Sequence, residues 1–359
     1  MSANSSTRKG VAVECIQVYY TGSSQLKAGD ALCYDHDATD TSVQNYNVED
    51  PSLNNIGHYA GIVSDGQTAA NLVGPCLVEI EVPTSVPGIT TVRSNLSITA
   101  GDLLAPIPGT RNWAKWCGIG RPLAQAMETV DRSTTAGRVR VRYGNLNLAD
   151  SVLASKATRF FDDFVGFGDR GAADVATYLL NGTSAAATFT DDIAGGVIGI
   201  LTDTTNNAQL VLNGEPFSLA AGKTSWFRAR FKVSSIAATT NTFLGLSITD
   251  TNYFSTKPTD YIGFESNDGV LTFNYVKDGT TGVVSVSTGV TLVADTFVDV
   301  AFFYDGNGNI YIYVNETQVA HTATTTEVPN DETLTLVADV VGGAARTLSI
   351  DRWEVGSAR

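Results

Sequence analysis

Residue types that commonly perform catalysis are scarce in this chain and poorly spaced for it. Only three histidines occur, and none belongs to a His-Glu-x-x-His pair. No Gly-x-Ser-x-Gly turn, which would present a nucleophilic serine, is present. The acidic pairs Asp162-Asp163, Asp191-Asp192 and Asp331-Glu332 are adjacent, and adjacent residues of a strand point to opposite faces. We therefore expect the protein not to be an enzyme.

Two segments partly match ligand-binding motifs. Residues 166–171 fit Gly-x-Gly-x-x-Gly, but no alternation of helices and strands follows, as a dinucleotide site requires. Asp305, Asn307 and Asn309 occupy oxygen-ligand positions of a calcium loop, but Ile310 stands where that loop needs glycine. We expect no cofactor and no dedicated metal site, with a β-hairpin turn at 305–309 and weak calcium binding as the alternative.

Arginine and valine alternate near the middle of the chain. Arg138, Arg140 and Arg142 are separated by single valines, which places three guanidinium groups on one face of a strand. Arginine suits protein interfaces because its planar guanidinium binds carboxylates through two hydrogen bonds. The stripe is therefore either a solvated face or a docking surface for an acidic protein.

Five aromatic residues are candidates for contact with sugar rings. Trp226, Tyr311 and Tyr313 lie on the amphipathic faces of predicted strands, and Tyr253 and Tyr261 lie in a predicted loop over 249–262. Facing outward, they would form a stacking platform. Cross-strand packing or an oligomer contact explains them equally well.

The elements that would position these residues are β-strands. Short apolar runs separated by turn residues indicate strands in the first part of the chain, at Val11–Tyr20, Ala31–Tyr34, Tyr59–Val63, Cys76–Val82, Leu103–Ile107 and Arg138–Tyr143. Beyond Arg159, segments such as Trp226–Val233 and Ile310–Asn315 alternate an apolar and an amphipathic face, as in a two-sheet sandwich. Helical patterns are short, at Pro122–Val130 and Ala172–Leu180.

We therefore predict an all-β protein with two domains. A flexible arm over 1–9 precedes a small β-barrel over 10–143, and a linker over 144–158 leads to a two-sheet jelly roll over 159–359. The barrel region repeats one phrase, Leu26–Leu32 and Ile98–Leu104, in which a Gly-Asp turn leads into a strand.

The composition disfavours nucleic acid as a binding partner. The 359 residues carry a net charge of -14, which disfavours nucleic acid because phosphate binding requires clustered Lys and Arg. Residues 1–143 hold 11 basic and 13 acidic residues, so their net charge is -2, and the remaining residues hold 12 and 24, for -12. No apolar run is long enough to span a membrane. The four cysteines form no Cys-x-x-Cys pair, and we expect free thiols.

Residues 10–143 resemble the small β-barrel decoration, or cement, proteins on the capsids of tailed phages. The segments Ile98–Pro106, Gly118–Ala126 and Gly137–Arg142 carry this resemblance. It implies a trimer that binds the major capsid protein on the outer surface of the virion and stabilises the shell without catalysis. It also implies synthesis in the host cytoplasm, in keeping with an N-terminus that lacks the apolar stretch of a secretory signal.

The second half resembles a concanavalin-type jelly roll of the laminin-G or lectin kind, through Phe161–Phe164, Gly195–Thr202, Trp226–Phe231, Phe302–Asn315 and Leu348–Trp353. This resemblance implies possible glycan binding. The expectation is a capsid decoration protein with an outward jelly roll. The alternatives are a carbohydrate-binding adhesin or fibre module without a cement role and, more remotely, a glycoside hydrolase.

Overall fold

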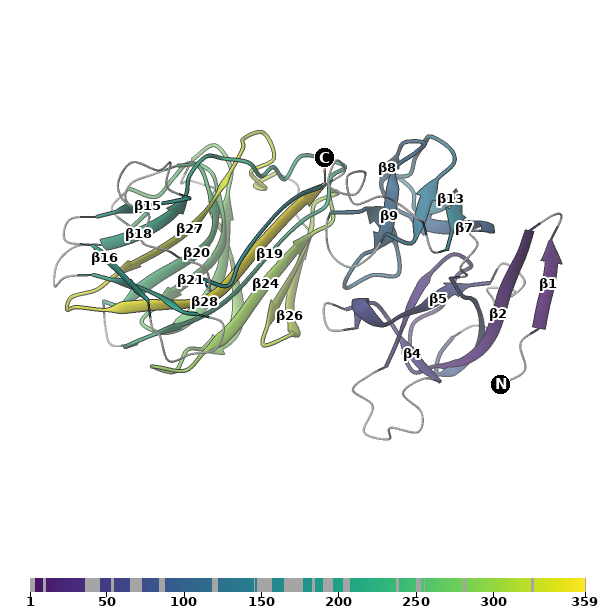
Figure 1. The fold of residues 1–359 in the computed structure, drawn as a ribbon, viewed down its shortest axis with the longest axis horizontal. Coiled ribbons are helices and arrows are strands. Elements are labelled where there is room, and N and C mark those ends of the chain that lie inside the picture. Colours follow the sequence, from purple (N-terminus) through teal and green to yellow (C-terminus); the bar gives the residue numbers. More distant parts are fainter. Residues whose placement is uncertain are drawn as a thin grey trace. The chain divides into compact units, whose positions relative to one another are not determined.

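The chain folds into two compact units, seen here in a computed structural model (Figure 1). The first comprises Met1–Ala157 with Gly222–Thr224 and Ala358–Arg359, and the second comprises Thr158–Ala221 and Ser225–Ser357. Most of the predicted linker over 144–158 lies outside the described residues. The structure describes residues 4–8, 11–35, 46–52, 55–64, 73–83, 88–117, 122–144, 146, 157–164, 177–182, 185–189, 196–202, 207–236, 239–249, 253–254, 256–279, 282–323 and 326–358.

A small closed barrel forms the start of the first unit. Its sheet has the order β1-β2-β4-β3-β5-β6, and pairing of β2 with β6 closes it. The strands are β1 (Asn4–Arg8), β2 (Val11–Tyr20), β3 (Ala31–Tyr34), β4 (Asn47–Glu49), β5 (Tyr59–Val63) and β6 (Cys76–Glu81), with a 3-10 turn at Ile56–His58. Val18, Leu32, Val78 and Ile80 fill its interior because alternate residues of each strand face inward.

The expected flexible arm is wrong for residues 4–8. Asn4–Arg8 form β1 and pair antiparallel with Val11–Cys15 of β2. A polar Ser/Thr segment without apolar alternation gives no sign of a strand in the sequence, but its backbone groups still hydrogen-bond along the edge of a neighbouring strand.

A second sheet of the first unit has the order β10-β9-β11-β13-β7, and a two-stranded sheet pairs β12 with β8. Their bounds are β7 (Gly88–Ser94), β8 (Ser97–Ile98), β9 (Leu103–Pro106), β10 (Trp113–Lys115), β11 (Ala124–Ala126), β12 (Val130–Asp131) and β13 (Gly137–Tyr143). The predicted helix over Pro122–Val130 is therefore wrong. Ala124 and Ala126 are buried while Gln125 is half-buried, which is the period of a strand, not of a helix.

The repeated phrase forms the same turn twice. Gly29 and Gly101 have φ of +89° and +90°, a conformation that favours glycine. In the first turn the Asp30 carboxylate accepts the backbone N–H of Lys27 at 2.8 Å, and in the second Asp102 accepts that of Thr99 at 2.7 Å. Each turn leads directly into a strand, as the sequence predicts.

Two sheets make up the second unit. The eight-stranded sheet E has the order β16-β17-β28-β19-β24-β25-β26, with β14 pairing β28, and the seven-stranded sheet F has the order β15-β18-β27-β20-β21-β22-β23. The strands of sheet E are β14 (Ala157–Asp162), β16 (Ala186–Phe189), β17 (Ile198–Leu201), β19 (Ser225–Val233), β24 (Val298–Tyr304), β25 (Asn309–Val314), β26 (Thr317–Ala323) and β28 (Thr347–Ala358). Those of sheet F are β15 (Tyr178–Asn181), β18 (Asn207–Leu212), β20 (Asn241–Ser247), β21 (Tyr261–Asn267), β22 (Val270–Val276), β23 (Val284–Thr291) and β27 (Thr335–Val341).

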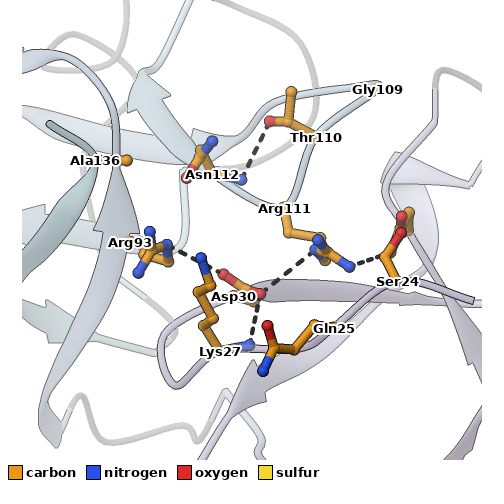
Figure 2. A pocket seen from close by; sticks show the side chains of 11 residues that line it. Ser24, Gln25, Lys27, Asp30, Arg93, Gly109, Thr110, Arg111, Asn112 and Ala136 are labelled. Atoms are coloured by element: carbon orange, nitrogen blue, oxygen red, sulfur yellow. Dashed lines mark hydrogen bonds and ion pairs between the residues drawn. The ribbon is translucent and has the colours of Figure 1, made fainter. Parts of the chain in front are cut away.

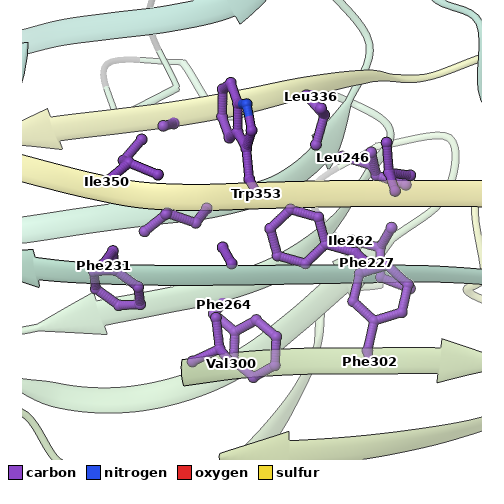
Figure 3. Close-up of a cluster of buried hydrophobic side chains, with 14 of the residues drawn as sticks. Phe227, Phe231, Leu246, Ile262, Phe264, Val300, Phe302, Leu336, Ile350 and Trp353 are labelled. Carbon is purple, nitrogen blue, oxygen red and sulfur yellow. The ribbon is translucent and has the colours of Figure 1, made fainter. Parts of the chain in front are cut away.

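The inner faces of the two sheets form one apolar core (Figure 3). Phe227 and Phe231 of β19 and Trp353 of β28 meet Phe264 of β21 and Leu336 of β27. The Trp353 indole N–H donates to the Tyr178 hydroxyl at 3.0 Å, which satisfies its polar atom inside the core. Strict apolar alternation in β19 predicts this inward face correctly.

The all-β prediction, with a small barrel and a jelly roll, is confirmed. The predicted helix over Ala172–Leu180 is wrong where it is described, because Tyr178–Leu180 belong to β15. No helix among the described residues is long and apolar enough to cross a membrane. No disulfide joins Cys15, Cys33, Cys76 and Cys117 in the described part of the chain.

Candidate functional site

The three arginines of the predicted stripe lie side by side on one face of β13. Arg138, Arg140 and Arg142 are exposed, while the alternating Val139 and Val141 are buried. Successive guanidinium groups therefore leave the strand about 6.7 Å apart, two residues of rise. The sequence pattern predicts this exposure correctly.

Neighbouring elements extend the stripe. In the antiparallel register Arg138 lies opposite Arg93 of β7 and Arg142 lies opposite Ile89, and residues directly opposite one another share a face. The Arg132 guanidinium donates through Nε and Nη2 to the carbonyl of Arg138, at 3.1 and 2.9 Å. The surface is thus basic with an exposed apolar residue, Ile89, beside it.

The positive charge of the stripe is poorly neutralised. Neither Arg140 nor Arg142 forms an ion pair with another described residue. Glu128 lies close by, but its carboxylate accepts the backbone N–H of Arg140 at 2.7 Å. Because the guanidinium is charged at every physiological pH and binds carboxylates through two hydrogen bonds, this face suits an acidic protein surface.

Tyr253 and Tyr261 are not exposed as expected. Both are fully buried in a small apolar cluster on the outer face of sheet F. The Tyr253 ring stacks on Phe243 at a centroid distance of 3.9 Å and meets Tyr261 edge-on at 5.2 Å. The segment that carries Tyr253 covers the sheet, and a sequence pattern shows only which side of a strand a residue occupies, not what covers that side.

Trp226, Tyr311 and Tyr313 are also buried, with exposed fractions of 6%, 6% and 1%. Tyr311 stacks on the imidazole of His321 at 4.7 Å, and the Arg159 guanidinium lies 6.0 Å from the Trp226 ring. These residues do occupy the outer side of sheet E, but neighbouring side chains cover them. The expected exposed aromatic platform is therefore wrong for all five candidates, and cross-strand packing is seen between Tyr311 of β25 and His321 of β26.

A polar row that the sequence does not predict crosses the outer face of sheet F. Strand register places its members directly opposite one another, one per strand. The polar members are Asn181, Gln209, Asp339, Glu265 and Thr272, and the apolar Phe243 of β20 lies between Asp339 and Glu265. β20, β21 and β22 are consecutive, but β15, β18 and β27 come from distant parts of the chain, so local spacing does not bring Asn181, Gln209 and Asp339 to this row.

Hydrogen bonds hold the carboxylates of this row. Glu265 Oε2 accepts from Lys257 Nζ at 2.6 Å, Asn274 Nδ2 at 2.9 Å and the Tyr253 hydroxyl at 3.3 Å. Asp339 is fully buried and accepts the Tyr253 backbone N–H at 3.1 Å. Burial raises the pKa of the Tyr253 phenol well above its usual range, so it remains a neutral donor. Glu265 is half-buried and Asp339 is fully buried, and both accept hydrogen bonds from the segment that carries Tyr253 and Lys257.

The calcium candidates form a turn instead of an oxygen cage. Asp305 Oδ1 accepts the backbone N–H groups of Asn307 and Asn309, at 2.7 and 3.0 Å, and Oδ2 accepts Asn309 Nδ2 at 2.6 Å. Donors thus surround the carboxylate that would have to bind a cation. The turn joins β24 and β25 as the predicted hairpin. The other partial motif, the Gly-rich segment 166–171, lies outside the described residues.

The second unit is a two-sheet jelly roll, and one family model matches part of it. Residues 204–352, which lie within it, match the family model of the concanavalin A-like lectin/glucanases superfamily. No curated protein matches the chain.

Solved structures give remote similarities that each cover a little over half of the chain. A protein of unknown function from Shewanella oneidensis is 15% identical, with a TM-score of 0.43, over 60% of this chain and 95% of that one. The carbohydrate recognition domain of Emp47p is 13% identical, with a TM-score of 0.41, over 56% and 97%. An endo-1,3-beta-glucanase from Streptomyces sioyaensis is 11% identical, with a TM-score of 0.40, over 56% and 97%.

Proposed function

We propose that this protein is a capsid decoration protein of a virus particle. In this proposal the first unit binds the major capsid protein on the outer surface of the shell, as a homotrimer, and stabilises it mechanically. The observation that carries the proposal is the exposed stripe of Arg138, Arg140 and Arg142 on a closed-barrel unit. Repeated weak contacts around a shell add up through multivalency, so no single contact has to be strong.

The docking test replaces Arg138, Arg140 and Arg142 together by Ser in the full chain. We expect capsid occupancy to fall, and to fall further with added salt, because screening weakens contacts between charged surfaces. Occupancy is measured by sedimenting particles with labelled protein. The control variant removes three cations from the second unit, Arg159, Lys232 and Lys277, and should bind normally. Full occupancy of the stripe variant, or unchanged pressure resistance of particles that lack the protein, would refute the docking role.

A second function, carbohydrate binding by the second unit, is favoured by its fold and by the polar row on sheet F. The concanavalin-like fold is consistent with carbohydrate binding. Asn181, Lys257 and Glu265 are half-buried, so they combine a fixed position with solvent access. Amide, ammonium and carboxylate groups held in this way suit the hydroxyls of a glycan. Tyr253 and Tyr261, buried on the same face of sheet F, would support this surface and not contact the sugar.

A further inference from the structure

A polar pocket of about 540 Å³ opens in the first unit above the buried carboxylate of Asp30 (Figure 2). The guanidinium groups of Arg93 and Arg111 lie on either side of this carboxylate. Arg93 Nε is 3.6 Å from Oδ1 and Arg111 Nε is 3.4 Å from Oδ2. The backbone N–H of Lys27, in the same turn, donates a hydrogen bond to Oδ2 of Asp30.

Cations exceed carboxylates around this pocket. Lys27, Arg93 and Arg111 face Asp30 and Asp50. Asp50 is already engaged, because its Oδ1 accepts the Tyr20 hydroxyl at 2.8 Å and lies 3.6 Å from Arg111 Nη1. The terminal nitrogens of Arg93 have no hydrogen-bond partner among the residues that the structure describes. One guanidinium edge and the exposed Lys27 side chain are thus left for an anion.

Size and position indicate the kind of anion. A pocket of several hundred Å³ accommodates a group of many atoms, far more than a single inorganic ion. Arg93 lies directly opposite Arg138 in the β7–β13 pair, and Ala136 lines the pocket next to β13. The pocket is therefore continuous with the arginine stripe. A segment lying along the stripe would bring a side chain to the pocket, where the free guanidinium edge matches a carboxylate.

We propose that this pocket receives one carboxylate side chain of an acidic, extended segment of the protein partner that docks on the arginine stripe. The inference rests on the proposed docking function and names the chemistry of the partner. Ser24, Thr110 and Asn112 line the same pocket and supply neutral hydrogen-bonding groups for the backbone of that segment.

Asp30 makes the affinity depend on pH. Burial raises the pKa of Asp30 to about 6, against the lowering effects of the Lys27 backbone N–H and of the Arg111, Arg93 and Lys27 charges. Asp50 and Tyr20 also face the Arg111 side chain, and burial raises the pKa of Tyr20 to about 12. Protonation of Asp30 removes a negative charge from the pocket. An ionised ligand carboxylate should therefore bind more tightly at about pH 5.5 than at about pH 7.5.

The test titrates the full chain with an acetylated and amidated Gly-Glu-Gly-Glu-Gly peptide, followed by NMR shifts at low salt. Replacing Arg93 by Gln should weaken binding about tenfold, the scale of a charged hydrogen bond. Asp30→Asn should tighten binding at about pH 7.5 and abolish the pH dependence. The control is Lys115→Gln, whose ammonium lies 3.3 Å from Asp102 in the second Gly-Asp turn and which should bind as the unaltered chain does.

Several results would overturn the inference. These are an Arg93→Gln affinity equal to that of the unaltered chain, no gain from Asp30→Asn, equal binding of the peptide with Gln in place of Glu, or binding of inorganic phosphate with no binding of peptide. The Asp30→Asn variant is expected to bind the peptide more tightly. If the Arg93→Gln variant does not fold, this gain in affinity still tests the inference. Loss of capsid occupancy in the stripe variant with unaltered peptide binding in the pocket variants would keep the docking function and refute this pocket.

Discussion

Burial and the neighbouring positive charges act in opposite directions on the pKa of Asp30. Its side chain is 4% exposed and lies between two guanidinium groups, yet burial outweighs them and raises its pKa to about 6. The unfolded chain ionises this carboxyl near pH 4. Between these two values the folded protein binds more protons than the unfolded chain, so its stability falls as the pH rises.

The folded protein should therefore lose about 3 kcal/mol of unfolding free energy through Asp30 as the pH rises from about 4 to above about 6. Replacement of Asp30 by Asn removes the titrating group and should flatten this part of the pH profile. Urea unfolding at a series of pH values measures the slope. Asp102→Asn alters the matching turn and should leave the slope in place; an unchanged slope in Asp30→Asn would show that burial does not govern this carboxyl.

The sequence predicts correctly whether a side chain is exposed where the alternation within a single strand determines it. The alternation of Arg138–Arg142 is enough to place three arginines on an exposed face, because the neighbouring valines must be buried. It fails for Tyr253 and Tyr311, whose exposure depends on a covering segment and on His321. Asp30 looks like a turn residue in the sequence, and only the approach of Arg93 from β7 and of Arg111 from the turn before β10 shows that it lines a pocket.

At the scale of elements, the two Gly-Asp turns are nearly identical in backbone but differ in surroundings. A Cβ on Gly29 would lie 3.1 Å from the backbone nitrogen of Arg93 and the backbone carbon of Val92. A Cβ on Gly101 would meet nothing within 4 Å. The first turn is packed against β7, which also brings Arg93 to Asp30, whereas the second is open.

Replacement of each glycine by alanine should separate the cost of positive φ from the cost of a steric contact with β7. Gly101→Ala should cost about 1 kcal/mol, because alanine is strained at positive φ. Gly29→Ala carries the same strain plus a contact with immovable backbone, which adds about 1 to 3 kcal/mol. Chemical denaturation of both variants measures the difference. Equal destabilisation would mean that β7 shifts freely, and the pocket above Asp30 would then not be a fixed structure.

Strand positions were largely predictable, whereas strand order was not. The bounds of β2, β3 and β5 coincide with apolar runs in the sequence, since each run buries its own alternate residues. The order of sheet F places β27 between β18 and β20, which only the packing of the whole unit decides. Asp339 and Glu265 consequently flank Phe243 without any sequence signal, and so the polar row was missed.

At the scale of the whole molecule, charge is divided between the two halves. Residues 1–143 carry a net charge of -2 and residues 144–359 carry -12. A nearly neutral unit with a basic stripe approaches an acidic protein surface without strong repulsion. In the proposed decoration role, a strongly acidic unit on each copy would repel its neighbours on the shell and remain solvated. The two candidate surfaces should therefore act independently, one toward protein and one toward carbohydrate.

If the two surfaces act independently, a variant of either one should lose one binding activity and keep the other. A glycan array should show binding that is lost in the Asn181→Ala, Lys257→Ala double variant, because both side chains lie on the half-exposed polar surface of sheet F. The same variant should keep full capsid occupancy. The variant with Ser at 138, 140 and 142 should lose occupancy and keep its glycan signal. Silence of the unaltered chain on the array would refute carbohydrate binding, and loss of both activities in either variant would mean that one surface serves both partners.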